Sequence, residues 1–205
     1  MPPVDYRLLL PTGWFRLRID PEGRERSVDA LLDRKFEGTD DAPHIKRQLR
    51  EELLAQATAA FQDGAIELYL SMQQAGPLTI PASLLVTLLP PPSGGLLPNT
   101  ADLAASLAAD KGAHVSIVEL SAGRAVRRRV TRGPSDRPVR DGVPVSADPV
   151  LPSVALDFQI PVPRTDAHLL LSFSTPLVQI ADPMVELFDA VAGSLTWVGG
   201  GSDDE

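Results

Sequence analysis

The segment 168–198 constrains the fold more than any other part of the chain, because a strand pattern is followed closely by a helix pattern. Its first residues alternate apolar with mixed side chains, and the apolar set is Leu169, Leu171 and Phe173. This period of two predicts a strand with one apolar face. Further on, apolar residues recur at steps of four, three and four, at Met184, Phe188, Val191 and Leu195. That spacing predicts an amphipathic helix that packs on the strand.

The ends of this predicted helix carry their own signals. Asp182 stands where an N-cap residue belongs, and Pro183 follows at the first helical position, where its missing N–H has no helical partner to lose. Residues 199–201 are glycines, which predicts that the helix stops there. We therefore expect one folded domain over residues 1–198 and a flexible, glycine-rich and acidic tail over residues 199–205.

Composition and charge exclude several classes of function. The chain has 205 residues with 43% hydrophobic content, which suits a single large core. Its net charge of -8 argues against nucleic acid as a partner, because a phosphate-binding surface needs positive potential. No cysteine is present, and no window reaches the roughly 18 apolar residues of a membrane span. Because the N-terminus lacks a basic and apolar leader, we expect a cytoplasmic protein that does not insert into a membrane.

Strand and helix patterns alternate along the chain. Period-two patterns predict strands over residues 6–10, 14–19, 65–74, 78–89, 115–120, 124–131, 154–160 and 168–174. Steps of three and four predict helices over residues 27–36, 42–63 and 100–112 in addition to the last one. The short links between strands favour antiparallel pairing. The predicted fold class is α+β, with a single antiparallel sheet of about seven or eight strands packed by helices, and residues 133–153 form a long proline-rich loop.

The helix predicted over residues 42–63 has the clearest pattern. Apolar side chains recur every four residues, at Ile45, Leu49, Leu53, Ala57 and Phe61. We expect this set to form the buried face of the helix. N-caps are expected at Thr39 or Asp41 for this helix, at Ser27 for the first helix and at Thr100 for the third.

No group of residues in the sequence is typical of a catalytic, cofactor or metal site. The histidines are His44, His114 and His168, and none has a second ligand at metal-binding spacing. Serine-nucleophile and phosphate-loop motifs are absent. The acid pairs at 40–41 and 51–52 are explained more simply by a helix cap and a solvated helix face. We therefore expect a non-enzymatic protein without a cofactor.

Four arginines gather on one predicted strand, at Arg127, Arg128, Arg129 and Arg132. Charge on a strand is typical of an exposed sheet edge, where it blocks pairing with other chains. This interpretation is favoured over recognition of an acidic partner, for which Arg127 and Arg129 are the candidates.

If the apolar alternates of all strands point to one side of the sheet, the polar alternates share the other. This second face comprises Trp14, Arg16, Arg18, Glu67, Tyr69, Ser71, Gln73, Asp157, Gln159, Leu170 and Ser172. Amphipathic rings beside arginines and amides are typical of protein-binding surfaces. The predicted partner-binding residues on it are Trp14, Arg16, Arg18, Tyr69, Gln73 and Gln159. Two alternatives stay open: a helix covers this face, or Trp14 packs at an end of the sheet.

Two short motifs resemble the PsbP-like superfamily. In the closing segments the matching residues are Leu171, Phe173, Ser174, Thr175, Pro176, Phe188, Ala192, Ser194, Leu195 and Trp197. Residues 10–14, Leu-Pro-Thr-Gly-Trp, are similar to the family's opening Pro-x-Gly-Trp. The family includes LpqN-like lipoproteins and Eag-type secretion chaperones, and it implies an α/β/α sandwich that acts as a scaffold or chaperone without catalysis. The loop 133–153 and the missing export signal depart from the lipoprotein branch.

The expected function is that of a non-enzymatic cytoplasmic adaptor or chaperone that binds another protein of unknown identity. The resemblance implies a link to a bacterial secretion or toxin system. Two alternatives remain: a structural module that forms a homodimer through an edge strand or the final helix, and an enzyme of unrecognised type. Replacing Trp14 and Tyr69 by alanine is expected to weaken capture of the partner and to leave the melting temperature near that of the wild type.

Overall fold

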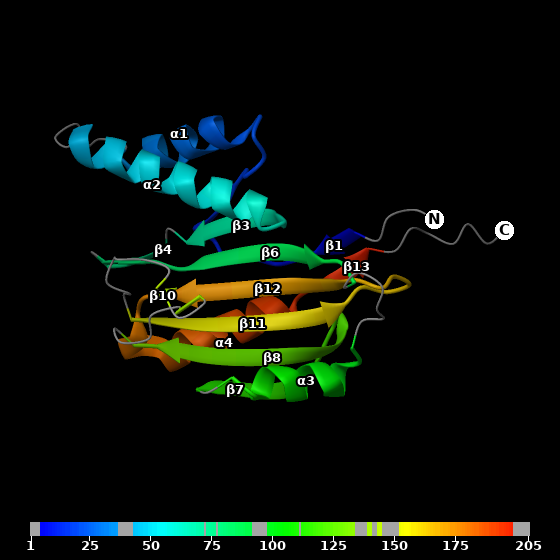
Figure 1. Ribbon diagram of the computed structural model, residues 1–205. Coiled ribbons are helices and arrows are strands. Elements are labelled where there is room, and N and C mark those ends of the chain that lie inside the picture. The colour runs from blue at the N-terminus through cyan, green and yellow to red at the C-terminus, as the bar shows by residue number, and fades with distance from the viewer. Residues whose placement is uncertain are drawn as a thin grey trace.

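The computed structural model describes residues 5–36, 43–71, 73–76, 78–91, 98–110, 112–133, 139–140, 143–144 and 152–198. Within them, antiparallel strands form a seven-stranded sheet in the order β2-β3-β6-β12-β11-β8-β7. In that order the strands are β2 (Trp14–Leu17), β3 (Ala65–Ser71), β6 (Ser83–Leu89), β12 (His168–Thr175), β11 (Ser153–Pro161), β8 (Gly123–Arg132) and β7 (Ala113–Leu120). The predicted α+β class with an antiparallel sheet is confirmed (Figure 1).

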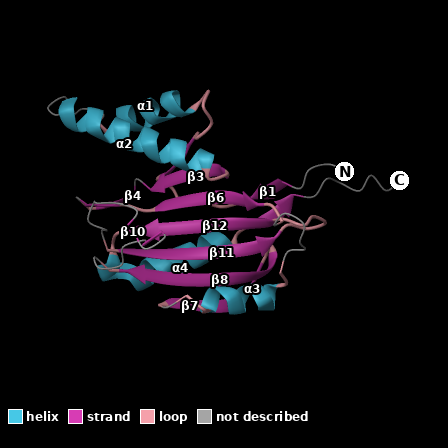
Figure 2. Ribbon diagram, in the orientation of Figure 1, coloured by secondary structure: helices cyan, strands magenta, loops and turns pink. Residues whose placement is uncertain are grey.

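Helices lie on both faces of the sheet. In the described residues they are α1 (Arg24–Lys35), α2 (Pro43–Gln62), α3 (Thr100–Ala108) and α4 (Ala181–Gly193), with a short 3₁₀ turn over Val178–Ile180. Figure 1 shows α4 behind the sheet, α1 and α2 beside β3, and α3 in front of β7 and β8. Figure 2 shows the same view with helices and strands in separate colours. Three short antiparallel pairs complete the fold: β1 (Asp5–Arg7) with β13 (Thr196–Val198), β4 (Gln73–Ala75) with β5 (Leu78–Ile80), and β9 (Val139–Arg140) with β10 (Val143–Pro144).

The helix α4 packs on the strands as the spacing of its apolar residues predicts. Met184, Phe188, Val191 and Leu195 are all at most 4% exposed. Met184, Phe188 and Val191 lie at steps of four and three within α4, so they share one side of the helix axis, and Leu195 follows directly after the helix end. The ring of Phe188 stacks on that of Phe173 from β12, with the centroids 4.9 Å apart.

The boundaries of this segment differ from the prediction. The helix begins at Ala181, so Asp182 lies in its first turn and does not cap it. The helix also ends at Gly193, and residues 196–198 form strand β13, which pairs with β1. This pairing joins the two ends of the chain, so no local pattern within residues 181–198 could reveal it.

The burial predicted for the apolar residues of α2 is wrong at both ends of the helix. Leu53 and Ala57 are buried, but Ile45 and Phe61 are 49% and 43% exposed. A helix turns about 100° per residue, so each step of four residues rotates the side chain about 40° further around the axis. Ile45 and Phe61 therefore lie about 80° to either side of Leu53, and only the middle of the set faces the sheet.

The other predicted caps are also corrected. Asn99 caps α3, because its side chain accepts from the backbone N–H groups of Ala101 and Asp102. The helix α1 begins directly after Gly23, which places Ser27 inside it. The residues predicted to cap α2, Thr39 and Asp41, lie outside the described residues.

The sheet carries two hydrophobic cores on opposite faces. Directly paired residues in an antiparallel sheet lie on the same face, so rows can be followed from strand to strand. One row lies on the α4 side and runs Arg16, Tyr69, Leu84, Phe173, Leu156, Arg129 and His114. The next row lies on the opposite side and runs Leu17, Leu68, Leu85, Ser172, Asp157, Arg128 and Val115. Apolar residues therefore change sides between β3 and β6.

The prediction that all apolar alternates share one face is wrong for this reason. Leu17 and Leu68 pack with α1 and α2, whereas Leu84 and Val86 of β6 and the buried residues of β11 and β12 pack with α4. Leu85 of β6 packs on the side of α1 and α2. The residues assigned to the second face are consequently divided between the two sides. The α4 side receives Trp14, Arg16, Glu67, Tyr69 and Ser71, and the opposite side receives Asp157, Gln159, Leu170 and Ser172.

Only part of the predicted loop 133–153 is described. It includes β9 and β10, which pair antiparallel with Val139 opposite Pro144 and Arg140 opposite Val143. The predicted tail 199–205 lies outside the described residues. In the described part of the chain, no helix combines the length and the apolar character that a membrane crossing requires.

Candidate functional site

A cavity of about 540 Å³ opens where β2 leaves the sheet. The residues that line it are Arg16, Leu17, Arg18, Ile19, Asp20, Phe61, Ala65 and Ile66. Its floor is buried and apolar, formed by Leu17, Ile19 and Ala65. Its rim is exposed: Phe61 and Ile66 are 43% and 46% exposed, and the side chains of Arg16 and Arg18 are both 62% exposed. We refer to this feature as the β2 cavity.

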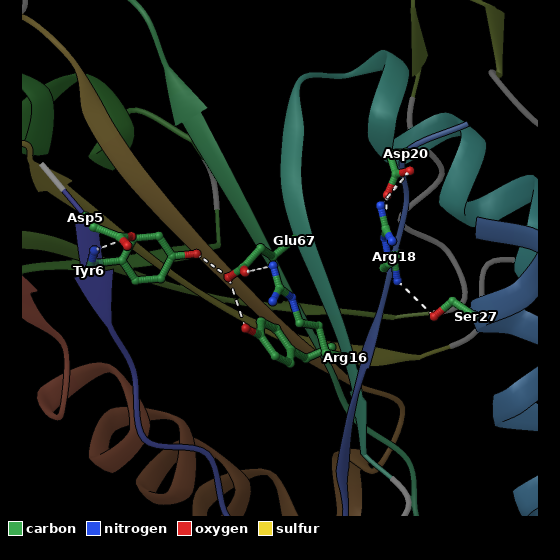
Figure 3. Close-up of polar contacts among 8 residues, drawn as sticks. Asp5, Tyr6, Arg16, Arg18, Asp20, Ser27 and Glu67 are labelled. Carbon is green, nitrogen blue, oxygen red and sulfur yellow. Dashed lines mark hydrogen bonds and ion pairs between the residues drawn. The ribbon is translucent and has the colours of Figure 1, made fainter. Parts of the chain in front are cut away.

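The β2 cavity forms because β2 and β3 separate after a short ladder. Their pairing ends at Leu17 and Leu68. Beyond that point the backbone N–H of Arg18 donates to Ser27 Oγ of α1, at 3.0 Å (Figure 3). Asp20 then accepts from the N–H of Gly23 at 2.8 Å and turns the chain into α1. On β3, the register shifts at Ile66, and a bulged residue leaves the regular ladder, so its side chain reaches the rim.

Beside the β2 cavity, Glu67 of β3 binds three donor groups (Figure 3). The hydroxyl of Tyr69 donates to Glu67 Oε2 at 3.0 Å, and the hydroxyl of Tyr6 on β1 donates to the same oxygen. Arg16 Nη2 lies 2.5 Å from Glu67 Oε1. The Glu67 side chain is only 15% exposed, so these contacts satisfy a carboxylate that is largely removed from water. The network joins β1, β2 and β3 on the α4 side.

Burial and the Glu67 carboxylate keep both phenols neutral. Burial, together with the nearby negative charge and hydrogen bond of Glu67, raises the pKa of Tyr69 to about 12. The pKa of Tyr6 is also raised, first by burial and then by its hydrogen bond to Glu67. Near neutral pH both hydroxyls act as hydrogen-bond donors to Glu67. The arrangement is therefore suited to holding the strands in place.

Arg18 forms the opposite part of the rim and is held by Asp20. Arg18 Nε and Nη2 donate to the two oxygens of Asp20 at 3.0 and 3.2 Å. These hydrogen bonds lower the pKa of Asp20 below its usual value. A guanidinium has more N–H donors than these contacts use, so Arg18 keeps donors that can face a ligand.

Of the predicted partner-binding residues, Arg16 and Arg18 lie at the β2 cavity, and two aromatic residues lie close by on the α4 side. Trp14 is half-buried against the main core, and its indole N–H is buried with no hydrogen-bond partner among the described residues. Tyr69 is half-buried and bound to Glu67. Because both aromatics support the fold, alanine at these positions is now expected to lower the melting temperature, contrary to the sequence-based expectation.

Gln73 and Gln159 lie apart from the β2 cavity. The side chain of Gln73 donates to the carbonyl of Thr12 at 3.1 Å and thereby supports the turn that contains Gly13. Gln159 lies in the middle of the sheet on the side opposite α4, directly paired with Leu170. Neither residue lines the β2 cavity. The predicted set therefore does not form one continuous surface.

The arginines of β8 lie inside the sheet and not at its edge. Since β8 pairs with both β7 and β11, the interpretation as edge protection is wrong. Alternate side chains instead reach carboxylates on both faces. The ion pairs are Arg127 with Asp189 at 2.7 Å, Arg129 with Asp182 at 2.8 Å, Arg128 with Asp157 at 3.1 Å, and Arg128 with Asp110. These pairs attach α4 to one side of β8 and the end of α3 to the other. A role of Arg127 and Arg129 in partner binding stays a prediction.

A second hollow, of about 520 Å³, lies on the side opposite α4, between α2 and β8. It contains part of the predicted second face, including Asp157 and Ser172. Three of its polar residues are engaged within the chain: Ser83 Oγ and Ser174 Oγ lie 2.8 Å apart, and Asp157 binds Arg128. The β2 cavity, with its exposed apolar rim, is therefore the stronger candidate for binding a partner.

Sequence patterns did not identify Phe61 and Ile66 as rim residues, because both fit apolar patterns that predicted burial. The rotation of a four-residue repeat around the helix axis could have revealed Phe61. Nothing in the sequence reveals the bulge that exposes Ile66. Among the described residues, no three histidine, aspartate or glutamate side chains are grouped in a way that could hold a metal ion.

Comparison with known families finds no family model that matches this chain, and no curated protein matches it in sequence. One solved structure to which it is similar is that of LpqN, described as involved in cell envelope biogenesis of Mycobacterium tuberculosis. The match has a TM-score of 0.49 and 11% sequence identity, and it covers 96% of this chain and 85% of the LpqN chain. A similarity of this strength carries no information about function. Membership of the PsbP-like superfamily stays a prediction.

Proposed function

We propose that this protein is a non-enzymatic adaptor or chaperone that binds another protein at the β2 cavity. The observation that carries the proposal is the composition of the rim. Two large apolar side chains, Phe61 and Ile66, are exposed next to two exposed arginines and above a buried apolar floor. Arginine and aromatic residues around an apolar pocket are enriched at the centres of protein interfaces.

The edge position of β2 supports a partner that binds in an extended conformation. β2 is the outermost strand on its side of the sheet, so its outer backbone groups face away from β3. An extended segment of a partner could add to this edge and place one apolar side chain into the β2 cavity. The arginine rim would then bind polar or acidic groups that flank that side chain.

The absence of catalysis is part of this proposal. The polar cluster next to the β2 cavity is bound within the chain, because Glu67 is bound by Tyr6, Tyr69 and Arg16. A cytoplasmic location and a link to a bacterial secretion or toxin system stay predictions. The genomic neighbours of the coding sequence would indicate which partner to test first.

The proposal is tested by comparing what the full chain and its variants capture from a lysate of the native host. The double substitution Phe61→Ser and Ile66→Ser should abolish capture of a specific protein and leave the melting temperature within a few degrees. Ile45→Ser is the matched control, because Ile45 is 49% exposed on the same helix but lies away from the β2 cavity. Cross-links from the captured protein should map near residues 16–20 and 61–67. If wild type and double variant retain the same proteins in equal amounts, the β2 cavity is not the binding site.

A further inference from the structure

The strand β7 forms the other edge of the sheet in the described residues, and it carries no lysine, proline or bulge. It pairs with β8 without interruption, from Ala113 opposite Val130 to Leu120 opposite Gly123. In the described residues it has no second strand partner. Exposed edge strands are commonly protected by charged side chains, proline, a bulge or a covering helix. Of these, β7 has one charged residue that points outward at the edge, Glu119, and α3 packs against the strand without pairing with its backbone. At eight residues it is also twice as long as β2, which has four.

The hairpin geometry determines which backbone groups of β7 face outward. The turn between β7 and β8 contains two residues, so the flanking pair, Leu120 and Gly123, exchanges both backbone hydrogen bonds. Hydrogen-bonded and non-hydrogen-bonded residue pairs then alternate along the hairpin, so the N–H and C=O groups of Ser116 and Val118 point toward β8. The groups of Val115, Ile117 and Glu119 point away. Within the described part of the chain, no hydrogen bond reaches these outward groups.

The outward groups are complementary to those of a second copy of the same strand. A two-fold axis at Ile117 would relate Val115 of one copy to Glu119 of the other, and Ile117 to its own counterpart. An antiparallel second copy would place Ile117 opposite Ile117 and Val115 opposite Glu119, and each pair would exchange both of its backbone hydrogen bonds. The alternative register about Ser116 would place Glu119 opposite Ala113. The N–H of Ala113 already donates to the Asp110 carbonyl at 3.2 Å. In that register the carbonyl of the opposing Glu119 would therefore have no donor.

The side chains of β7 favour the same register. Ile117 points to the α3 side, because it pairs with the buried Val126, yet it is 41% exposed. A second copy about Ile117 would cover this side chain with its own counterpart. Glu119 is bound by Arg124 of β8 at 3.1 Å and would face the uncharged Val115. No like charges would meet directly across the new pair, although each chain carries a net charge of -8.

We propose that this protein forms a homodimer in which two β7 strands pair antiparallel about Ile117 and join two sheets into one. The β7 edge and the β2 edge lie at opposite ends of the sheet order. The dimer would therefore present two β2 cavities, one at each outer end of the joined sheet. This inference does not depend on the proposed function, because it involves a different edge and different residues.

The test measures the mass of the full chain in solution by light scattering over a wide concentration range. Wild type should reach twice the 22.0 kDa mass of the chain. Ile117→Pro removes an outward N–H that the described part of the chain does not use, so it should reduce the mass to that of one chain and lower the melting temperature only by the contribution of the second copy. Ser116→Pro is the matched control for the fold, because it removes an N–H that bonds β8, and it should lower the melting temperature further than Ile117→Pro does.

A second pair of variants separates strand pairing from a general loss of apolar surface. Ile117→Lys should give the single-chain mass, whereas Ile66→Lys, at a residue of similar exposure (46%), should keep the dimer. Hydrogen exchange at the Val115 and Glu119 amides should be slow in wild type and fast in Ile117→Lys. The proposal is overturned by a single-chain mass of wild type at all concentrations, or by a dimer that persists in both Ile117 variants. The proposal is also overturned if the protein has the mass of a single chain and a co-purifying peptide protects these amides. In that case the strand that pairs with β7 belongs to a different molecule.

Discussion

Tyr69 of β3 pairs directly with Leu84 of β6, so a half-buried phenol and a fully buried leucine point to the same side of the sheet. At this pair the apolar residues change from the side of α1 and α2 to the side of α4. One consequence is that helices pack on both faces. Another is that the polar residues of β2 and β3 are held against the edge of the α4 core, where they form the Glu67 network beside the β2 cavity.

Two phenylalanines that both fit apolar patterns should respond differently to truncation. Phe188→Ala should lower the free energy of unfolding by about 3–5 kcal/mol, because Phe188 is fully buried and stacks on Phe173. Phe61→Ala should change it by less than about 0.5 kcal/mol, because Phe61 is 43% exposed. Urea unfolding of both variants measures the difference. Equal losses would mean that Phe61 is buried and that the rim of the β2 cavity is wrongly assigned.

The hydroxyl of Tyr6 should stabilise the attachment of β1 to the sheet. Tyr6→Phe removes one donor from the enclosed Glu67 carboxylate, and we expect a loss of about 1–2 kcal/mol in the free energy of unfolding. Faster hydrogen exchange in β1 and β13 should accompany the loss, since these strands pair with each other. A variant with unchanged stability and unchanged exchange would show that Tyr6 does not anchor this pair.

The raised pKa of Tyr69 makes stability fall at alkaline pH. An unfolded tyrosine loses its proton near pH 10.0, whereas Tyr69 in the folded protein keeps it until about pH 12. Between these values the unfolded state has fewer bound protons, so the free energy of unfolding decreases as pH rises. Below pH 10 this contribution is fully present. In Tyr69→Phe the decrease should be smaller, and denaturant unfolding on both sides of pH 10 measures it. An equal decrease in both proteins would contradict the assignment.

Arg127 should contribute more to stability than Arg124, although both lie on β8. Arg127 binds both oxygens of Asp189 on α4, and its side chain is 19% exposed. Arg124 binds Glu119, and both side chains are more than half exposed. Arg127→Ala should cost about 1–3 kcal/mol of unfolding free energy, and Arg124→Ala less than about 0.5 kcal/mol. Thermal unfolding of the two variants compares them directly, and a larger loss for Arg124→Ala would refute the role of Arg127 in attaching α4.

Local sequence patterns correctly predicted the buried residues of those elements that pack one side against a single core. The strands β11 and β12 and the helix α4 each bury one side against the same core, so their periods of two and near 3.6 residues predicted which residues are buried. The antiparallel pairing of β7 and β8 was predicted from the short link, residues 121–123, between two strand patterns, and in the structure Gly123 joins β8, so the turn has two residues. Arg16 and Arg18 were predicted as partner-binding residues and lie at the β2 cavity, but the apolar residues beside them were assigned to the core.

The sequence by itself determined the α+β class, the antiparallel pairing of neighbouring strands and the buried sides of β11, β12 and α4, since these depend on residues a few positions apart. Only the tertiary structure decided which face of the sheet each buried side occupies, that β8 lies inside the sheet, and that β1 pairs with β13. These features depend on the register between strands that are distant in the chain. A shift of one residue in such a pairing moves every side chain to the other face, and no local spacing records it.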